Sequence, residues 1–205
     1  MLKKFLYLSV ALLVGLLLAG LFISPEFNVE QSVVIQARPV DIHPYVDDLK
    51  QWPKWTPWQA IEPDIKIRYG NVTRGIGASQ SWQGKGGSGH LNITASAPDN
   101  GIAYDIYFDK EEIPSIGAIE YQLLDNNMTR VTWRMHGEIE FPLLGGYIAL
   151  ITTMITADMF NKGLLRLKAV VERNTKPSGG TAMVLQRSVP LSARIACRPG
   201  NNRSC

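Results

Sequence analysis

The feature that most constrains the fold is a two-residue alternation of apolar and polar side chains that persists from residue 65 to residue 138. This is the period of a β-strand with one buried face. Short separators rich in Gly, Asn, Asp and Pro interrupt the alternation, such as GKGGSG at 84–89 and PDN at 98–100. Because these separators have the composition of turns, we expect consecutive strands to pair antiparallel in a meander.

An additional strand precedes this meander, because the segment NVEQSVVIQA is rich in β-branched residues. The alternation also assigns the faces of the sheet. Tyr104 and Trp133 fall on the covered face, whereas Asp105 and His136 fall on the other face. The sequence therefore predicts seven strands, at 28–37, 65–70, 77–84, 90–97, 101–108, 116–124 and 129–138.

The segment from residue 142 to residue 174 has helical periodicity instead. Apolar side chains recur at spacings of three to five residues, and most charged side chains lie off that stripe. We expect a long amphipathic helix that covers the sheet, with a break near Gly145 and Gly146. The predicted apolar stripe consists of Ile148, Ile151, Ile155, Met159, Leu164, Leu167 and Val171. A short helix, kinked near Pro44, is predicted between the first two strands.

The N-terminal residues 5–23 contain no charged side chain. A helix of this length, rising about 1.5 Å per residue, spans about 28 Å, which is close to the roughly 30 Å of a bilayer's hydrocarbon core. A cleaved signal peptide is the alternative, but its apolar region is usually only about 7–15 residues long. We therefore expect an uncleaved single-pass anchor, with Lys3 and Lys4 keeping the N-terminus in the cytoplasm and the main domain extracytoplasmic.

Three parts are predicted: a membrane anchor at 1–25, a globular domain at 26–174 and a basic tail at 175–205. The tail carries five basic and no acidic side chains, whereas the domain carries 14 basic and 18 acidic ones. The mildly acidic domain gives no argument for a nucleic-acid partner. The tail lacks sustained periodicity, so we expect it to be largely disordered. Its cysteines, Cys197 and Cys205, could close only a small terminal loop.

Three tryptophans, Trp52, Trp55 and Trp58, lie in the segment QWPKWTPWQ, where the prolines disfavour a regular α-helix. Both a 3₁₀ turn and a polyproline-like path have three residues per turn, so either path places the three indoles on one side. Two interpretations follow. The indoles close the open end of the core, or they form a wall that faces a ligand.

The order of these elements resembles the START-like superfamily, also called SRPBCC, and most closely its polyketide cyclase/dehydrase-type members with an N-terminal membrane segment. The resemblance covers about residues 28–173 and is carried by SVVIQARPVDIHPYVDDLKQWPKWTPW, GIGASQSWQG and FPLLGGY…FNKGLLRLKAVVE. It implies an α+β helix-grip fold, in which a curved antiparallel sheet surrounds the long C-terminal helix with an apolar cavity between them. It also implies that the three tryptophans lie at the cavity rim.

Polar-tipped side chains on the covered face are the candidates for ligand contacts. Tyrosine and tryptophan combine a large apolar area with one hydrogen-bonding group, which suits a largely apolar ligand. A filled core, in which those groups bond to the backbone, is the alternative. The candidate ligand-binding residues are Trp52, Trp55, Trp58, Tyr69, Gln80, Trp82, Tyr104, Tyr121 and Trp133.

The sequence contains no convergent catalytic set. His43, His90 and His136 fall on separate elements, and each is expected to be a surface or capping residue. Since there is also no CxxC motif, Cys/His cluster or paired acid and base, we expect neither a metal site nor a cofactor.

These observations favour a membrane-tethered protein that binds a small hydrophobic molecule or lipid without catalysis. The alternatives are a polyketide cyclase/dehydrase-like enzyme acting on a hydrophobic carbonyl substrate, and an envelope protein-interaction module. An exposed apolar patch on the outer face of the sheet would favour the interaction module. The oligomeric state stays open.

Overall fold

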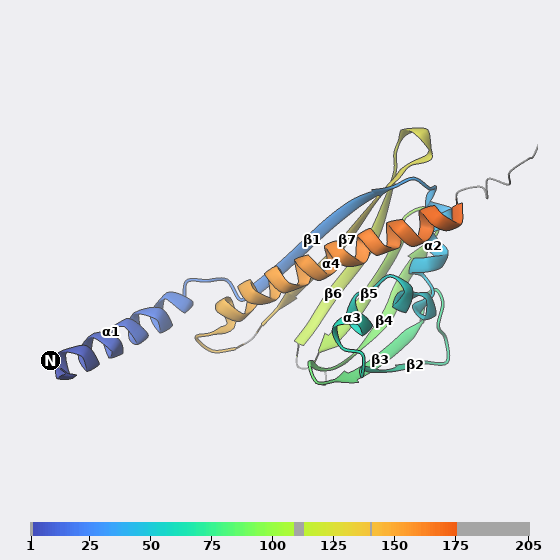
Figure 1. The fold of residues 1–205 in the computed structure, drawn as a ribbon. Coiled ribbons are helices and arrows are strands. Elements are labelled where there is room, and N and C mark those ends of the chain that lie inside the picture. The colour runs from blue at the N-terminus through green and yellow to red at the C-terminus, as the bar shows by residue number, and fades with distance from the viewer. Residues whose placement is uncertain (1, 109–112, 140, 176–205) are drawn as a thin grey trace, which may run out of the picture.

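One antiparallel sheet carries a long helix across one face, and an apolar helix projects from one end (Figure 1). The computed structural model describes residues 2–108, 113–139 and 141–175. The predictions for the tail beyond Thr175, including those for Cys197 and Cys205, lie outside these residues. The helices are α1 (Leu2–Gly20), α2 (Pro39–Val46), η1 (Leu49–Lys54), α3 (Trp58–Ile61), η2 (Asp125–Asn127) and α4 (Gly145–Thr175), of which η1 and η2 are 3₁₀ helices. The strands are β1 (Glu26–Ile35), β2 (Lys66–Tyr69), β3 (Ser79–Gly84), β4 (Gly87–Ala97), β5 (Gly101–Phe108), β6 (Ile113–Leu123) and β7 (Thr129–Glu138).

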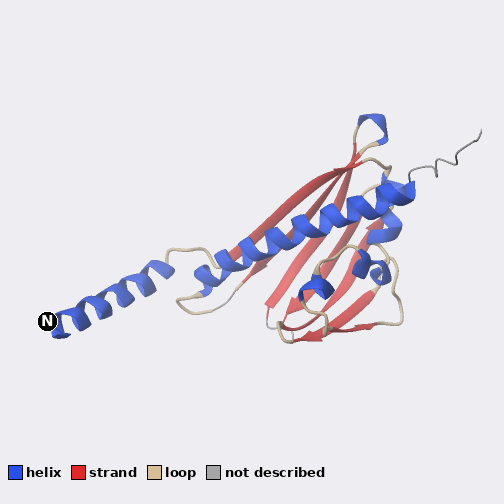
Figure 2. Cartoon of the chain, viewed as in Figure 1, coloured by secondary structure: helices blue, strands red, loops and turns tan. Residues whose placement is uncertain are grey.

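Within the described part of the chain the sheet has seven strands in the order β1-β7-β6-β5-β4-β3-β2. All neighbours pair antiparallel, and strands β2 to β7 form the predicted meander (Figure 2). The first strand closes the arrangement by pairing with the last, so that Glu26 lies opposite Glu138 and Ile35 opposite Thr129. With α4 lying on one face of this sheet, the α+β helix-grip fold is confirmed.

The core lies between the sheet and α4 and is centred on Trp133. The predicted alternation is confirmed, because Tyr104 and Trp133 are buried while His136 is exposed. Trp133 stacks on Phe160 of α4, with ring centroids 3.9 Å apart and ring planes 4° apart. The helix can approach this closely because residue 163 is glycine. A Cβ atom there would lie only 2.9 Å from Cζ3 of Trp133.

The predicted stripe on α4 is buried in its C-terminal half and partly exposed in its N-terminal half. Leu164, Leu167 and Val171 are buried. Ile148 and Ile155 are 37% and 55% exposed, but both line the space between the helix and the sheet, as Met159 does. Ile151, which is 57% exposed, does not line that space, whereas Ala149 and Thr156 are buried in this half. The periodicity identifies a helix, but it does not decide which of two apolar faces meets the sheet.

The helix begins at Gly145 instead of residue 142, so the predicted break near Gly145 and Gly146 is its first residue pair. Leu143, just before it, has a φ of 63°, which is left-handed backbone incompatible with a continuing α-helix. A Cβ atom on Gly145 would lie 2.5 Å from the carbonyl oxygen of Ile139, and one on Gly146 would lie 2.5 Å from that of Ile23. The glycine pair therefore lets the end of β7 and the linker after α1 pack closely against the helix start.

Replacing Gly163 by leucine should lower the free energy of unfolding by about 1–3 kcal/mol, because the added side chain pushes α4 away from Trp133. Leucine has the higher intrinsic helix propensity, so a loss can be assigned to packing. Ala169→Leu is the matched control, since Ala169 is exposed on the same helix and should change stability by less than about 0.5 kcal/mol. Urea unfolding of the full chain in mild detergent, followed by tryptophan fluorescence, measures both. Equal stabilities would contradict the packing argument.

Candidate functional site

A cavity of about 370 Å³ lies between the sheet and the N-terminal half of α4. Its volume falls within the roughly 300–1,000 Å³ typical of small-molecule sites. The described side chains that line it are almost all apolar or aromatic, and none of these is charged. The lining residues are Phe27, Trp52, Trp58, Ile65, Ile67, Gln80, Trp82, Leu91, Tyr104, Ile106, Phe108, Trp133, Met135, Ile139, Ile148, Thr152, Ile155, Thr156, Met159 and Phe160.

The cavity is bounded by the sheet on one side and by the N-terminal half of α4 on the other. Strands β3, β4, β5 and β7 direct alternate side chains toward the helix, as their two-residue period requires. On the helix side, Thr152 and Thr156 occupy positions where a larger residue would fill the space. Trp82 and Phe108, whose rings meet edge to face at 5.7 Å, belong to the wall formed by the sheet.

One buried hydrogen bond supplies the most defined polar group in the cavity wall. Trp133 Nε1 donates to the hydroxyl of Tyr104 at 2.7 Å, and Tyr104 is 1% exposed. Burial raises the pKa of Tyr104 well above its ordinary value, so the phenol stays neutral and keeps its proton. Since its oxygen accepts from Trp133, Tyr104 retains an O–H that can be donated. The amide of Gln80 and the hydroxyls of Thr152 and Thr156 belong to other polar side chains of the lining.

The structure divides the nine predicted ligand-binding residues into two groups. The cavity lining includes Trp52, Trp58, Gln80, Trp82, Tyr104 and Trp133. The other three, Trp55, Tyr69 and Tyr121, do not belong to it. Tyr69 lies on the edge strand β2 and is 36% exposed, whereas Tyr121 lies below α2. The alternation of side chains along their strands predicted that both tyrosines lie on the covered face. The cavity occupies only part of that face, so a residue on the face need not line the cavity.

The three tryptophans of this segment occupy different positions in the structure. It forms a 3₁₀ helix, η1, followed by the first turn of α3. Trp55 is fully buried and donates to the Tyr45 carbonyl at 2.8 Å, so it closes the core. Trp52 donates to the Val46 carbonyl at 2.9 Å while its ring also lines the cavity, and Trp58 lines the cavity as well.

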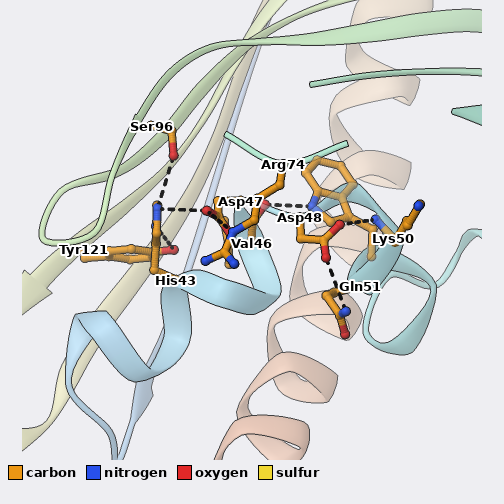
Figure 3. Close-up of polar contacts among 10 residues, drawn as sticks. His43, Val46, Asp47, Asp48, Lys50, Gln51, Arg74, Ser96 and Tyr121 are labelled. Atoms are coloured by element: carbon orange, nitrogen blue, oxygen red, sulfur yellow. Dashed lines mark hydrogen bonds and ion pairs between the residues drawn. The ribbon is translucent and has the colours of Figure 1, made fainter. Parts of the chain in front are cut away.

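A second group of polar side chains lies under α2, outside the cavity lining (Figure 3). His43 is at its centre. Its Nε2 atom lies 3.1 Å from Ser96 Oγ and 3.5 Å from Asp47 Oδ2, and its Nδ1 atom lies 3.5 Å from the hydroxyl of Tyr121. Asp47 is also paired with Arg74, whose Nε is 3.0 Å from Asp47 Oδ2. We name these five residues the His43 cluster.

His43 is not the surface or capping residue that its sequence context predicted, because it is only 5% exposed. Helix α2 packs over the covered face of the sheet and encloses the imidazole between Tyr121 and Ser96. Desolvation lowers the pKa of His43, although the nearby Asp47 carboxylate opposes this, so the ring is neutral near pH 7. The sequence signal that was missed is the spacing of four between His43 and Asp47, which places both on one face of a helix.

The other two histidines lie apart from this cluster, as predicted. His90 stacks on Tyr107 with ring centroids 4.7 Å apart, and His136 Nδ1 lies 2.8 Å from Asn28 Oδ1. Both contacts are with residues of neighbouring strands. Within the described residues the three histidines therefore do not converge on one site.

The comparisons with known proteins support the fold and do not identify a function. No family model matches the chain, and no curated protein matches it. A Thermobifida fusca protein solved in solution superposes with a TM-score of 0.56 at 17% identity, over 71% of this chain and 93% of that one. Norcoclaurine synthase from Thalictrum flavum, in complex with dopamine and hydroxybenzaldehyde, superposes with a TM-score of 0.54 at 10% identity, over 74% of this chain and 90% of that one. A Staphylococcus aureus protein of unknown function gives 0.56 at 13% identity, over 74% and 97% of the two chains.

The free energy of unfolding should fall as the pH drops below the ordinary histidine pKa of about 6.5. Because the folded state lowers the pKa of His43, the unfolded chain binds the proton more readily, so stability is complete above that pH and is lost below it. Urea midpoints measured between about pH 7.5 and about pH 5 should show a smaller pH dependence for His43→Gln than for the unaltered chain. His136→Gln, at an exposed site, is the control. An unchanged pH dependence in His43→Gln would contradict the assignment.

Proposed function

We propose that the domain binds a small hydrophobic molecule or a lipid in the cavity under α4. The observation that carries the proposal is an uncharged, largely aromatic and aliphatic cavity of about 370 Å³ in the core of the fold. A charged ligand would lose its hydration there without gaining a countercharge from the lining. An apolar ligand with one or two polar atoms would be accepted, since Tyr104, Gln80 and Thr152 offer hydrogen bonds.

A solved structure of the same fold supports a small-molecule site. In norcoclaurine synthase from Thalictrum flavum, the protein is in complex with dopamine and hydroxybenzaldehyde. Both ligands are small and aromatic, so this architecture can hold molecules of the size that the present cavity accommodates. At 10% identity the comparison supports the class of ligand and does not indicate a specific compound.

We further propose that residues 1–25 tether the domain, residues 26–174, to a membrane, and that residues 175–205 form a separate basic tail. Helix α1 is long and apolar enough to cross a bilayer, and its side chains are exposed instead of packed on the domain. With Lys3 and Lys4 at its N-terminus, the positive-inside tendency favours a cytoplasmic N-terminus and an extracytoplasmic domain.

An enzyme acting on a hydrophobic carbonyl compound is the second candidate. Tyr104 and Trp133 form a buried polar pair at 2.7 Å, and the free O–H of Tyr104 could donate a hydrogen bond to a carbonyl oxygen bound in the cavity. Among the described residues, the cavity lining includes no carboxylate or histidine to act as a base. We therefore keep binding without chemistry as the first proposal.

The protein-interaction alternative required an exposed apolar patch on the outer face of the sheet. That face carries charges instead, with Arg134 paired to Glu30 at 3.1 Å and to Glu120 at 3.0 Å. Ile116 is an exposed large apolar residue of β6 on this face, whereas Leu123, seven positions further, points to the opposite face because side chains alternate along a strand. The outer face therefore gives this alternative no support.

Thr152→Phe should reduce ligand occupancy strongly, because the phenyl ring would occupy part of the cavity. Native mass spectrometry of the full chain released from detergent, followed by extraction and identification of the bound species, measures that occupancy. Thr153→Phe is the matched control, since Thr153 is the same residue type on the same helix but does not line the cavity. A chain that carries no bound species in either form, across a panel of lipids and hydrophobic compounds, would contradict the binding proposal.

The anchor proposal predicts that the mature protein keeps its first 25 residues. Its intact mass in the membrane fraction should correspond to the complete 22.8 kDa chain, and it should resist extraction by alkaline carbonate. Cleavage after the apolar run, seen as a shorter chain in the soluble fraction, would establish the signal-peptide alternative instead.

A further inference from the structure

A second apolar surface lies at the start of α4, in addition to α1. Phe141 and Leu143 are 55% and 45% exposed, and Ile151 on the helix is 57% exposed. No residue from Phe141 to Ala157 is charged. Beyond this stretch, charged side chains such as Lys162 and Arg166 appear on the exposed side of the same helix. The helix surface therefore changes from apolar to charged along its length, although the sheet covers its inner face throughout.

The start of α4 is attached to the end of α1. The hydroxyl of Tyr147 donates to the carbonyl of Leu16 at 2.8 Å, and Gly20 lies against both Tyr147 and Leu143. Leu16 is four residues inside the helix end, a distance of about 6 Å along the axis. If α1 spans a bilayer, these contacts place the loop before α4 beside the last lipid-facing turns of α1. Figure 1 shows α1 approaching α4 at its N-terminal end, far from its C-terminal end.

The exposed apolar surface continues into the cavity. Ile148 and Ile155 are 37% and 55% exposed, and both also line the cavity. Phe27 at the start of β1 and Ile139 just after β7 line it from the same end of the domain. The part of the cavity nearest α1 is thus bordered by side chains that belong to the exposed surface.

We propose that Phe141, Leu143, Leu144, Ile148 and Ile151, here named the entry surface, insert into the half of the bilayer next to the domain. This insertion places the cavity mouth at the lipid surface, so that the ligand exchanges directly with the membrane. The proposal rests on the membrane tether proposed above and extends it from an anchor to a docking geometry.

The bilayer is the occupant that the contacts favour over a second copy or a soluble partner. The entry surface lies at the level of the last turns of α1, so any other partner would have to enter the headgroup region to reach it. Leaving these side chains in water costs about 25 cal/mol per Å² of apolar area, a cost that contact with the acyl chains would remove. The tyrosine at the junction, Tyr147, is a residue type enriched at membrane interfaces.

Depth-dependent quenching tests the proposal on the full chain in phosphatidylcholine vesicles. A single cysteine is placed at Leu144, Ile151 or Leu165 in a chain carrying Cys197→Ser and Cys205→Ser, and is labelled with the environment-sensitive fluorophore NBD. Leu165 is the matched control, because it is 52% exposed on the same helix but lies among charged residues. Vesicles containing doxyl-labelled phosphatidylcholine should remove most of the emission at Leu144, less at Ile151 and little at Leu165.

Two results would overturn the proposal. Labels at Leu144 and Ile151 that are quenched by aqueous iodide as readily as the label at Leu165 would show that the entry surface lies in water. Labels protected from both iodide and doxyl lipid would show that protein covers it, and dilution of the chain in the vesicles would identify a second copy. Unchanged far-UV circular dichroism confirms that each labelled chain is folded. If the labels report water while native mass spectrometry still detects a bound species, the docking geometry fails and the binding function stands.

Discussion

The packing of α4 against Trp133 is the contact on which the rest of the domain depends. Trp133 stacks on Phe160, meets Trp55 edge to face at 5.2 Å, and donates its Nε1 proton to Tyr104. Gly163 makes the approach possible by leaving no Cβ in the path of the indole. One side chain of the last strand therefore fixes the helix, joins the tryptophan segment to the sheet and forms part of the cavity wall. Without this contact the helix would lack a defined height above the sheet, and the cavity would lack a defined volume.

The two halves of α4 pack differently on the same sheet. In the C-terminal half, Leu164, Leu167 and Val171 are buried and fill the space above the strands. In the N-terminal half the cavity lining includes the short side chains of Thr152 and Thr156 and the partly exposed aliphatic side chains of Ile148 and Ile155, and the space between helix and sheet stays open. The same arrangement leaves exposed apolar surface at the end of the domain that adjoins α1.

A buried histidine and a buried carboxylate, His43 and Asp47, lie at α2 and outside the cavity lining. Burial lowers the pKa of His43 and raises the pKa of Tyr104 and Tyr121, so that all three groups are neutral near pH 7. Asp47 is the buried acidic side chain of this region, and it is paired with Arg74 at 3.0 Å. The His43 cluster joins α2 to β4 and β6, and none of its five residues lines the cavity. Its hydrogen bonds and ion pairs connect α2, the loop that carries Arg74, and two strands of the sheet.

The sequence by itself determined the meander, the long closing helix, the α+β helix-grip fold and the covered face of each strand, because local periodicity reports which side of an element is buried. It also identified most of the aromatic cavity lining, since alternation places Trp82, Tyr104 and Trp133 on one face. Only the tertiary structure decided which face of α4 meets the sheet, because the N-terminal half of that helix is apolar on two sides. It likewise decided that His43 is buried and that Tyr121 lies under α2 instead of in the cavity. These outcomes depend on where a helix rests along a sheet, and that position is set by the fit of side chains distant in sequence, such as Gly163 against Trp133, which no local pattern records.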